Sequence, residues 1–445
     1  MSSDDHLFNL KAVVRQTGIK PDTLRAWERR YGLPKPARSS GGHRLYSQHD
    51  IDTLNWLVAR QQEGLSIKRA VEQWRQVEAE GHDPLQMVTA FAPHTSAAPS
   101  PYAAGETLKQ MREDWLQACL SYDEQQTALI LNQAFALYPP EAVAVEGLQR
   151  AAAQVGEGWY EGEVTVQQEH FCSALIVRRL EALVMAAPPP SRPGRILVAC
   201  PPEEYHIISA LLLTFLLRRR GWQVLYLGAN VPIEQLETMV TAAKPNLVIM
   251  AAQRLHTAAK LVEVAQLLRQ EKAPMAYGGL VFNMLPALRR RVAGHFLGEV
   301  LEAAPQAVES LMTAPHPVPV AEETPEAYRQ ARDRFVERRA LIEAQLIRKL
   351  EGGGLAHQHL AMANQQIGLN IDAALALGDI HFLGTDLEWV RGLLRNYQVP
   401  DGSMSAYLQA YLEAATEQLG KDDPVVGWLG ELVGEATGEG QPIAS

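Results

Sequence analysis

The sequence predicts a multidomain protein of mixed α and α/β class. It would combine a winged helix-turn-helix head, a four-helix bundle followed by a doubly wound parallel sheet, and an all-helical carboxyl-terminal domain. Three observations predict this fold class. Residues 1–78 combine short helical segments with a basic, glycine-rich turn, residues 194–313 alternate apolar strands with helices, and two linkers rich in Pro and Ala separate the parts. The 445 residues are enough for three domains.

Composition limits the class of protein. No apolar run approaches the roughly 20 residues that cross a bilayer, and no signal peptide is recognisable, so we expect a soluble, cytoplasmic protein without a membrane partner. Three cysteines, far apart and without zinc spacing, fit a reducing compartment. Residues 1–75 contain 13 Lys and Arg against 8 Asp and Glu, although the whole chain carries a net charge of −10. A basic head on an acidic body indicates a nucleic-acid-binding module.

The amino-terminal head, residues 1–78, shows the order helix, turn, helix, hairpin and two further helices. A short helix begins at Leu10, and Gly18 turns the chain. The second helix runs over Pro21–Tyr31, where proline is tolerated in the first turn. This is the layout of a helix-turn-helix motif, and the basic hairpin that ends at Tyr46 would be its wing.

A linker at residues 92–105 precedes a helical region, residues 106–190. Its pattern predicts a four-helix bundle with helices over 108–120, 122–137, 140–161 and 164–187. Trp159 ends the third helix, and Glu169 and His170 begin the fourth, so an indole and two polar side chains are brought together. From the bundle alone, the favoured interpretation is a capped helix pair with Trp159 in the core and the other two residues exposed.

Residues 194–313 predict a doubly wound parallel sheet, with strands over 195–199, 224–227, 247–251, 275–277 and 295–297. Glu204 and His206 follow the first strand, at the carboxyl edge where such sheets bind ligands. A histidine whose second ring nitrogen is held by a carboxylate suits metal ligation. Gly278 and Gly279 end the fourth strand, where the missing side chains would let a flat ligand approach the backbone. No glycine-rich fingerprint follows the first strand, which argues against a dinucleotide fold.

The carboxyl-terminal third follows a second linker at residues 314–323. Residues 324–445 predict an all-helical domain with helices over 325–351, 358–377, 384–396, 403–419 and 425–433. We interpret it as an oligomerisation or partner-binding domain, although the sequence leaves its role open. Three histidines of this third are interpreted as surface residues: His357, His359 and His381.

The head resembles the MerR family of transcriptional regulators over residues 8–75, through the motif TLRAWERRYGLPKPARSSGGHRLYS. The resemblance implies that the head binds double-stranded operator DNA. Helix residues would face the major groove and phosphates, and wing residues would grip the backbone: Thr23, Arg25, Arg29 and Arg30 in the helix, and His43, Arg44 and Tyr46 in the wing. Trp27 and Leu45 are expected in the core.

The central region resembles the cobalamin-binding domains of methionine synthase and corrinoid proteins. The resemblance rests on the bundle, the Trp-x9-Glu-His spacing, the Glu-x-His after the first strand and the Gly-Gly after the fourth. With the head, the chain resembles light-dependent B12 regulators of the CarH/LitR type. The resemblance implies a Rossmann-like cobalamin domain in which His206 is the lower cobalt ligand, with Glu204 behind it. Further implied contacts with adenosylcobalamin are Trp159, Glu169 and His170 at the adenosyl face, and Ala251, Ala252, Gly278 and Gly279 along the nucleotide tail.

Three features depart from that family pattern. Ser209 stands where glycine is usual, Ala251 and Ala252 stand where a hydroxyl residue is common, and Tyr160 stands where light-sensing relatives carry a histidine that can take the upper cobalt site after photolysis. A phenol, with a pKa of about 10, is a poor cobalt ligand at neutral pH.

We therefore expect a non-enzymatic, light-responsive transcriptional regulator that binds adenosylcobalamin. It would form a homodimer or homotetramer, and this assembly would change with the state of the chromophore. Two alternatives stay open. One is a regulator of the same build that senses another tetrapyrrole, such as a bilin or heme, or that is insensitive to light. The other, from a different class, is a corrinoid protein that carries methyl groups.

Overall fold

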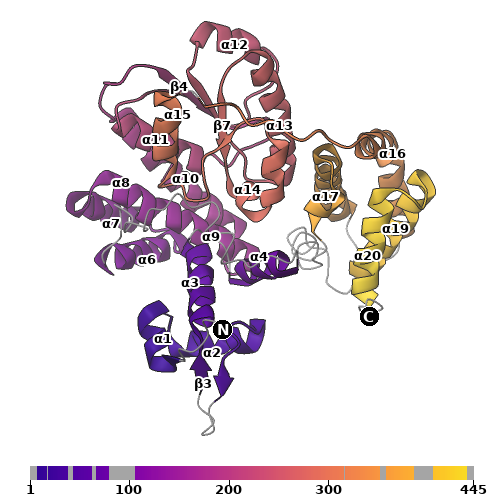
Figure 1. Ribbon diagram of the computed structural model, residues 1–445, viewed down its shortest axis with the longest axis horizontal. Helices are drawn as coiled ribbons and strands as arrows, with labels where there is room; N and C mark the ends of the chain where they lie inside the picture. The colour runs from indigo at the N-terminus through magenta and orange to yellow at the C-terminus, as the bar shows by residue number, and fades with distance from the viewer. Residues whose placement is uncertain are drawn as a thin grey trace, which may run out of the picture. The chain divides into compact units, whose positions relative to one another are not determined.

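The computed structural model describes residues 8–17, 19–38, 44–62, 67–79, 106–314, 316–350, 357–384 and 404–437 (Figure 1). The chain divides into two compact units, residues 1–159 and 160–445, and each is described by itself. The head, the parallel sheet and the carboxyl-terminal helices confirm the predicted fold class. No described helix is long and apolar enough to cross a membrane. The first linker, residues 92–105, and the helix predicted over 384–396 lie outside the described residues.

The head is a small helical domain with a three-stranded antiparallel sheet in the order β1-β3-β2. Its core is built from apolar side chains of all its helices, among them Val13, Leu24, Leu54 and Trp74. Helix α2 ends at Gly32, whose φ of 65° is the left-handed conformation that glycine adopts without strain. The elements are β1 (Phe8–Asn9), α1 (Leu10–Thr17), α2 (Pro21–Tyr31), β2 (Ala37–Arg38), β3 (Arg44–Tyr46), α3 (Gln48–Gln62) and α4 (Ile67–Ala79).

The four segments predicted for the bundle are helical. They form α6 (Glu106–Leu120), α7 (Glu124–Leu137), α8 (Pro140–Ala142), the π-helical turn η1 (Val143–Gln149), α9 (Arg150–Glu161) and α10 (Val166–Met185). Helix α6 packs against α7 and η1. Arg112 Nη1 of α6 donates a hydrogen bond of 2.9 Å to the carbonyl of Glu146, whose carboxylate is buried and accepts from Arg150 at 2.7 Å.

The sheet is wholly parallel, in the order β5-β4-β6-β7-β8. Helices α11 and α15 cover one face, and α12 and α13 cover the other (Figure 1). The strands are β4 (Arg195–Ala199), β5 (Gln223–Gly228), β6 (Leu247–Ala251), β7 (Met275–Gly278) and β8 (His295–Phe296). The helices are α11 (Ile208–Arg219), α12 (Leu236–Ala243), α13 (Leu255–Gln270), α14 (Leu280–Met284), the 3-10 helix η2 (Pro286–Arg291) and α15 (Ala304–Thr313).

The helical pattern of residues 284–293 predicts one helix there, and this prediction is wrong. The chain there forms α14, a break at Leu285 and then η2. Leu285 has φ −128° and ψ 75°, outside the helical region, because a residue that precedes a proline is disfavoured in the α conformation.

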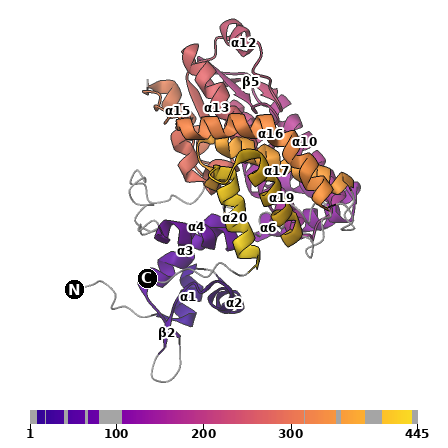
Figure 2. The ribbon, with the colours of Figure 1, turned by 90° about the vertical axis from the view of Figure 1, so that its right-hand side faces the viewer.

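The carboxyl-terminal helices are continuous with the sheet rather than separate from it. Helix α17 packs on α13, and the core that begins on the α13 face of the sheet extends through α16, α17, α19 and α20. Figure 2 shows these four helices gathered together. Their bounds are α16 (Glu326–Leu350), α17 (His357–Leu377), the 3-10 helix η3 (Ile380–Leu383), α19 (Met404–Leu419) and α20 (Pro424–Thr437).

The second predicted linker is anchored at its carboxyl end. Glu322 N donates to the carbonyl of Arg290 at 2.8 Å, and Arg291 Nη1 donates to the carbonyl of Glu323 at 2.7 Å. Thr324 Oγ1 then donates to the carbonyl of Ala376 in α17, at 2.8 Å. We call residues 322–324 the strap, because hydrogen bonds attach them to η2 of the sheet domain at one end and to α17 at the other.

Candidate functional site

The loop between β4 and α11 is held in a tight, irregular path. Glu203 has a φ of 66°, and its N–H donates to Asn230 Oδ1 at 2.8 Å. The carbonyl of Glu204 accepts from Asn230 N at 2.9 Å. These contacts turn the Glu204 side chain inward, beneath the sheet edge, and leave the Tyr205 side chain exposed.

The Glu204 carboxylate is fully buried and receives four hydrogen bonds. Oε1 accepts from His206 Nδ1 at 2.6 Å and from His206 N at 2.9 Å. Oε2 accepts from Thr257 Oγ1 at 2.6 Å and from Gln253 N at 2.7 Å. Burial acts to raise the pKa of Glu204, but the hydrogen bonds from His206, Thr257 and Gln253 outweigh it and hold the pKa at about 2. The carboxylate is therefore a fixed anion.

His206 presents one ring nitrogen outward. Nδ1 lies against the Glu204 anion, which favours the tautomer with the proton on Nδ1 and leaves a lone pair on Nε2. The side chain is 51% exposed, and Arg254 Nη2 lies 3.3 Å from Nε2. No group of three or more His, Cys, Asp and Glu gathers as a metal cage among the residues with described positions. His206 thus offers a single imidazole, which fits a metal whose other ligands come from its own macrocycle.

A second acid-x-His pair provides a comparison. Asp379 Oδ1 contacts both His381 Nδ1 and His381 N at 2.9 Å, which repeats the pattern of Glu204 and His206. The Asp379 side chain is 41% exposed, however, whereas that of Glu204 is fully buried. Burying a charge is costly, so the hydrogen bonds to Glu204 must offset a desolvation cost that the exposed Asp379 does not bear.

The carboxyl ends of β4, β6 and β7 bring other predicted residues together. Gln253 Nε2 donates to Ser209 Oγ at 2.7 Å, and Gln253 Oε1 accepts from Leu280 N at 2.9 Å. A Cβ on Gly279 would collide with the carbonyl oxygen of Ala252, whereas a Cβ on Gly278 would meet nothing within 4 Å. Glycine is therefore required at 279 for packing, and the backbone at 278 is open to a ligand. Ala251 and Ala252 are buried at the end of β6.

Three residues of this edge were missed by the sequence analysis: Gln253, Arg254 and Thr257. A signal was present, because they follow β6 and parallel strands end at one edge. The sequence analysis considered only the two alanines that precede them.

The remaining predicted cofactor residues lie on α9 and α10. Trp159 is half-buried and Tyr160 is 39% exposed, both near the end of α9. Helix α10 begins with a capping box between Thr165 and Gln168, just before the predicted pair. Glu169 is bonded to His170 Nδ1 at 2.7 Å and to Ser173 Oγ at 2.6 Å, and the His170 side chain is 75% exposed.

The predicted DNA-binding residues of the head divide into two groups. Thr23, Arg25, Arg29 and Arg30 are exposed on α2. Tyr46 is instead fully buried, and its hydroxyl donates to Glu28 Oε1 at 2.5 Å, so the expectation that it grips DNA is corrected. Arg44 Nε donates to the other oxygen of Glu28 at 2.6 Å, which ties the wing strand to α2. His43 lies outside the described residues.

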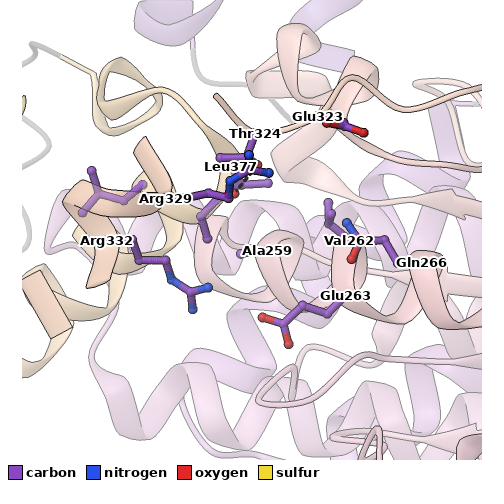
Figure 3. A pocket seen from close by; sticks show the side chains of 11 residues that line it. Ala259, Val262, Glu263, Gln266, Glu323, Thr324, Arg329, Arg332 and Leu377 are labelled. Carbon is purple, nitrogen blue, oxygen red and sulfur yellow. Dashed lines mark hydrogen bonds between the residues drawn. The ribbon is translucent and has the colours of Figure 1, made fainter. Parts of the chain in front are cut away.

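A pocket of about 440 Å³ with a mixed polar and apolar lining lies where the strap joins α13 to the carboxyl-terminal helices (Figure 3). Its lining includes Glu263, Thr324, Arg329 and Arg332. The two arginines are paired, Arg329 with Glu326 and Arg332 with Asp372. None of the predicted cofactor residues lines this pocket.

Comparison with known proteins gives three family matches. Residues 8–74 match the MerR HTH family regulatory protein model, and residues 111–184 and 194–308 match two B12 binding domain models. The chain is 30% identical over 299 residues to the HTH-type transcriptional repressor CarH of Myxococcus xanthus, a match that covers 66% of this chain and 96% of that protein. It is 29% identical to the repressor CarA of the same organism, covering 61% of this chain and 86% of CarA.

Among solved structures, the monomethylamine corrinoid protein of Methanosarcina barkeri matches with 18% identity and a TM-score of 0.41. That match covers 47% of this chain and all of the other. The matched family ranges end at residue 308, before the strap and α16.

Proposed function

Because this chain belongs to the family of MerR-type, B12-binding transcriptional regulators that includes CarH and CarA, we propose that its affinity for operator DNA is set by adenosylcobalamin and by light. The observation that carries the cofactor part is the buried Glu204 anion, which holds His206 with Nε2 directed outward. Bound adenosylcobalamin would supply a cobalt–carbon bond that light can cleave.

The residues of this chain would hold the cofactor in distinct ways. His206 Nε2 would donate its lone pair to the metal, and Glu204 would maintain the tautomer. The open backbone at Gly278 would lie along the nucleotide tail. We assign Trp159, with Tyr160, Glu169 and His170, to the opposite face, on the family resemblance and on the match of residues 111–184 to a B12 binding domain.

On the DNA side, we assign the exposed α2 residues to operator contacts: Thr23, Arg25, Arg29 and Arg30. Guanidinium groups bind phosphates and guanine edges, so they supply both affinity and register. A single head of this size makes few contacts. We therefore propose that a homodimer or homotetramer places several heads on one operator. Dissociation of the oligomer would lower the affinity for DNA, because each head would then bind alone. The protein would act without catalysing a reaction.

A second candidate keeps this architecture but changes the pigment. The Ser209–Gln253 hydrogen bond and Tyr160 are the observations that favour it, since both differ from the family pattern. A heme would also accept the His206 imidazole. Such a regulator would retain a bilin or heme from its host and would not retain adenosylcobalamin.

The test is a visible absorption spectrum of the purified protein after incubation with adenosylcobalamin in the dark, removal of unbound cofactor and illumination with green light. We expect a retained cobalamin spectrum that changes on illumination, and its loss in His206→Ala. His381→Ala is the matched control, because it removes an imidazole from the same acid-x-His pattern elsewhere in the chain. Equal retention by both variants would rule out His206 as the ligand, and no retention by wild type would favour the second candidate.

A further inference from the structure

The outward nitrogen of His206 has a hydrogen-bond partner of its own. Arg254 Nη2 lies 3.3 Å from His206 Nε2. A guanidinium group has only N–H donors, and it stays charged in proteins. Because the Glu204 anion favours the proton on Nδ1, Nε2 can only accept. Arg254 therefore donates a hydrogen bond to the lone pair that a metal at His206 would need.

The Glu204 carboxylate fixes both members of this pair. Its Oε1 holds the imidazole ring, and its Oε2 accepts from Thr257 Oγ1 at 2.6 Å and from Gln253 N at 2.7 Å. Arg254 is the next residue and the N-cap of α13, and its N–H donates to Thr257 Oγ1 at 3.2 Å. The backbone that carries the guanidinium is thus tied to the same anion as the ring, so the fold itself brings the two side chains together.

His381 shows that this arrangement is not a general property of an acid-x-His pair. Its Nδ1 contacts Asp379 as that of His206 contacts Glu204, but its Nε2 lies 4.0 Å from the carboxylate of Glu431. An ionised carboxylate can only accept hydrogen bonds. The donor at Nε2 is therefore a feature of the sheet edge at His206, contributed by the start of α13.

We infer that Arg254 guards His206, because it competes with the metal for the Nε2 lone pair and so sets the cofactor concentration at which the protein is loaded. This inference rests on the proposed function, which supplies the metal. One lone pair serves either an N–H group or a metal, so ligation must break the hydrogen bond and move the guanidinium away. The guanidinium charge also opposes a cationic metal at that nitrogen until it moves. Without Arg254, the same imidazole would bind the same metal more tightly, since nothing would have to be displaced.

The first measurement uses the protein without cofactor. Diethyl pyrocarbonate acylates the lone-pair nitrogen of a neutral imidazole, and histidine is neutral at about pH 8. The proteins are wild type, Arg254→Ala and the control Arg269→Ala, an exposed arginine in the last turn of α13. Loss of one hydrogen bond corresponds to a factor of about five. Peptide mass analysis should therefore show His206 modified about fivefold faster in Arg254→Ala and within about twofold in the control, with His381 as the internal standard.

The second measurement is the dissociation constant of adenosylcobalamin in the dark, followed by visible absorbance. We expect Arg254→Ala to bind about fivefold tighter than wild type and Arg269→Ala to bind within about twofold of it. A gain of affinity separates competition from a structural role, since a substitution that only loosened the loop would weaken binding. Circular dichroism of each variant shows whether the fold is retained.

The guard and the proposed function can fail separately. An unchanged rate of His206 modification in Arg254→Ala would overturn the guard. Weaker or unchanged binding of adenosylcobalamin by that variant would also overturn it, and in both cases binding by wild type leaves the proposed function intact. Failure of every protein to bind adenosylcobalamin would overturn the proposed function, and the competition with it, even if His206 were modified faster.

Discussion

At the scale of single residues, the Glu204 carboxylate organises the proposed cofactor site, because four donors from two connections converge on it. Thr257 and Gln253 lie far from Glu204 in the sequence, yet their hydrogen bonds add to those of His206 in offsetting the burial of the carboxylate. The sequence showed the Glu-x-His pair, since both members lie in one loop. The other two donors were missed, although they follow β6, because it is the parallel pairing of β4 with β6 that places them beside that loop.

Glu204→Gln tests this organisation. The substitution keeps the shape but replaces one acceptor oxygen with an amide donor, which would face a donor from His206, Gln253 or Thr257. We expect adenosylcobalamin affinity in the dark to fall about 10- to 100-fold, as for other groups that orient a metal-bound histidine. Glu203→Gln, the exposed neighbour, is the control and should bind as wild type does. If the two variants bound equally, the carboxylate would have no role in orienting His206.

Cys200, just past β4, gives a pH-dependent prediction. Burial, with a smaller effect of the Glu204 charge, raises the pKa of its thiol from 9.0 to about 12. The folded protein therefore holds this proton where the unfolded chain loses it, so stability falls as pH rises from about 9 towards 12. At pH 9 only about one thiol in a thousand is ionised. Iodoacetamide at that pH should leave Cys200 unmodified in the native protein and alkylate it in urea, as peptide mass analysis would show; rapid native alkylation would contradict the buried placement.

At the scale of elements, helix α2 and the wing are joined through Glu28, which binds both Arg44 and Tyr46. The helix bounds of the head followed from capping and turn residues such as Pro21 and Gly32. The burial of Tyr46 did not follow, because a tyrosine in a basic hairpin is as compatible with a DNA contact as with a place in the core. The Glu28 carboxylate on α2, which accepts the hydrogen bond of the Tyr46 hydroxyl, places Tyr46 in the core.

Two substitutions separate operator contact from core. Arg29→Ala should weaken binding to duplexes selected from a random pool by the wild-type protein, and should lower the slope of log affinity against log salt by about one per head, since one phosphate contact is lost. Tyr46→Phe should leave that slope unchanged and lower the free energy of unfolding by about 1 kcal/mol, the loss of one buried hydrogen bond. Salt titrations by fluorescence anisotropy measure the slope, and a reduced slope for Tyr46→Phe would restore Tyr46 to the DNA interface.

At the scale of the whole molecule, the sheet and the carboxyl-terminal helices of the second unit share one core. The sequence predicted the helices but not their docking, because an apolar stripe does not identify its partner. One signal was available: α13 carries apolar residues on more than one side, as a helix covered on both sides does. Ala259 and Val262 of α13 line the same pocket as Leu375 of α17.

Removal of residues 318–445 tests the shared core. The truncated chain would expose the outer side of α13, so we expect a lower midpoint of thermal unfolding than the full chain and binding of an apolar dye by the native state. The full chain should show one cooperative transition for sheet and helices together. Identical midpoints with no dye binding would mean that the carboxyl-terminal helices fold independently.

Helix α13 connects the sheet edge at His206 to the carboxyl-terminal helices. Its amino-terminal end begins beside Gln253 and Arg254, at the edge where His206 lies, and its flank supports α17. At 16 residues it is a rod about 24 Å long. A tilt of α13 by about 5° at one end would move its other end by about 2 Å, so any tilt that cofactor binding at His206 caused would also displace α17. A relative whose chain ended with the sheet would have the same imidazole beside α13 but no carboxyl-terminal helices packed on that helix.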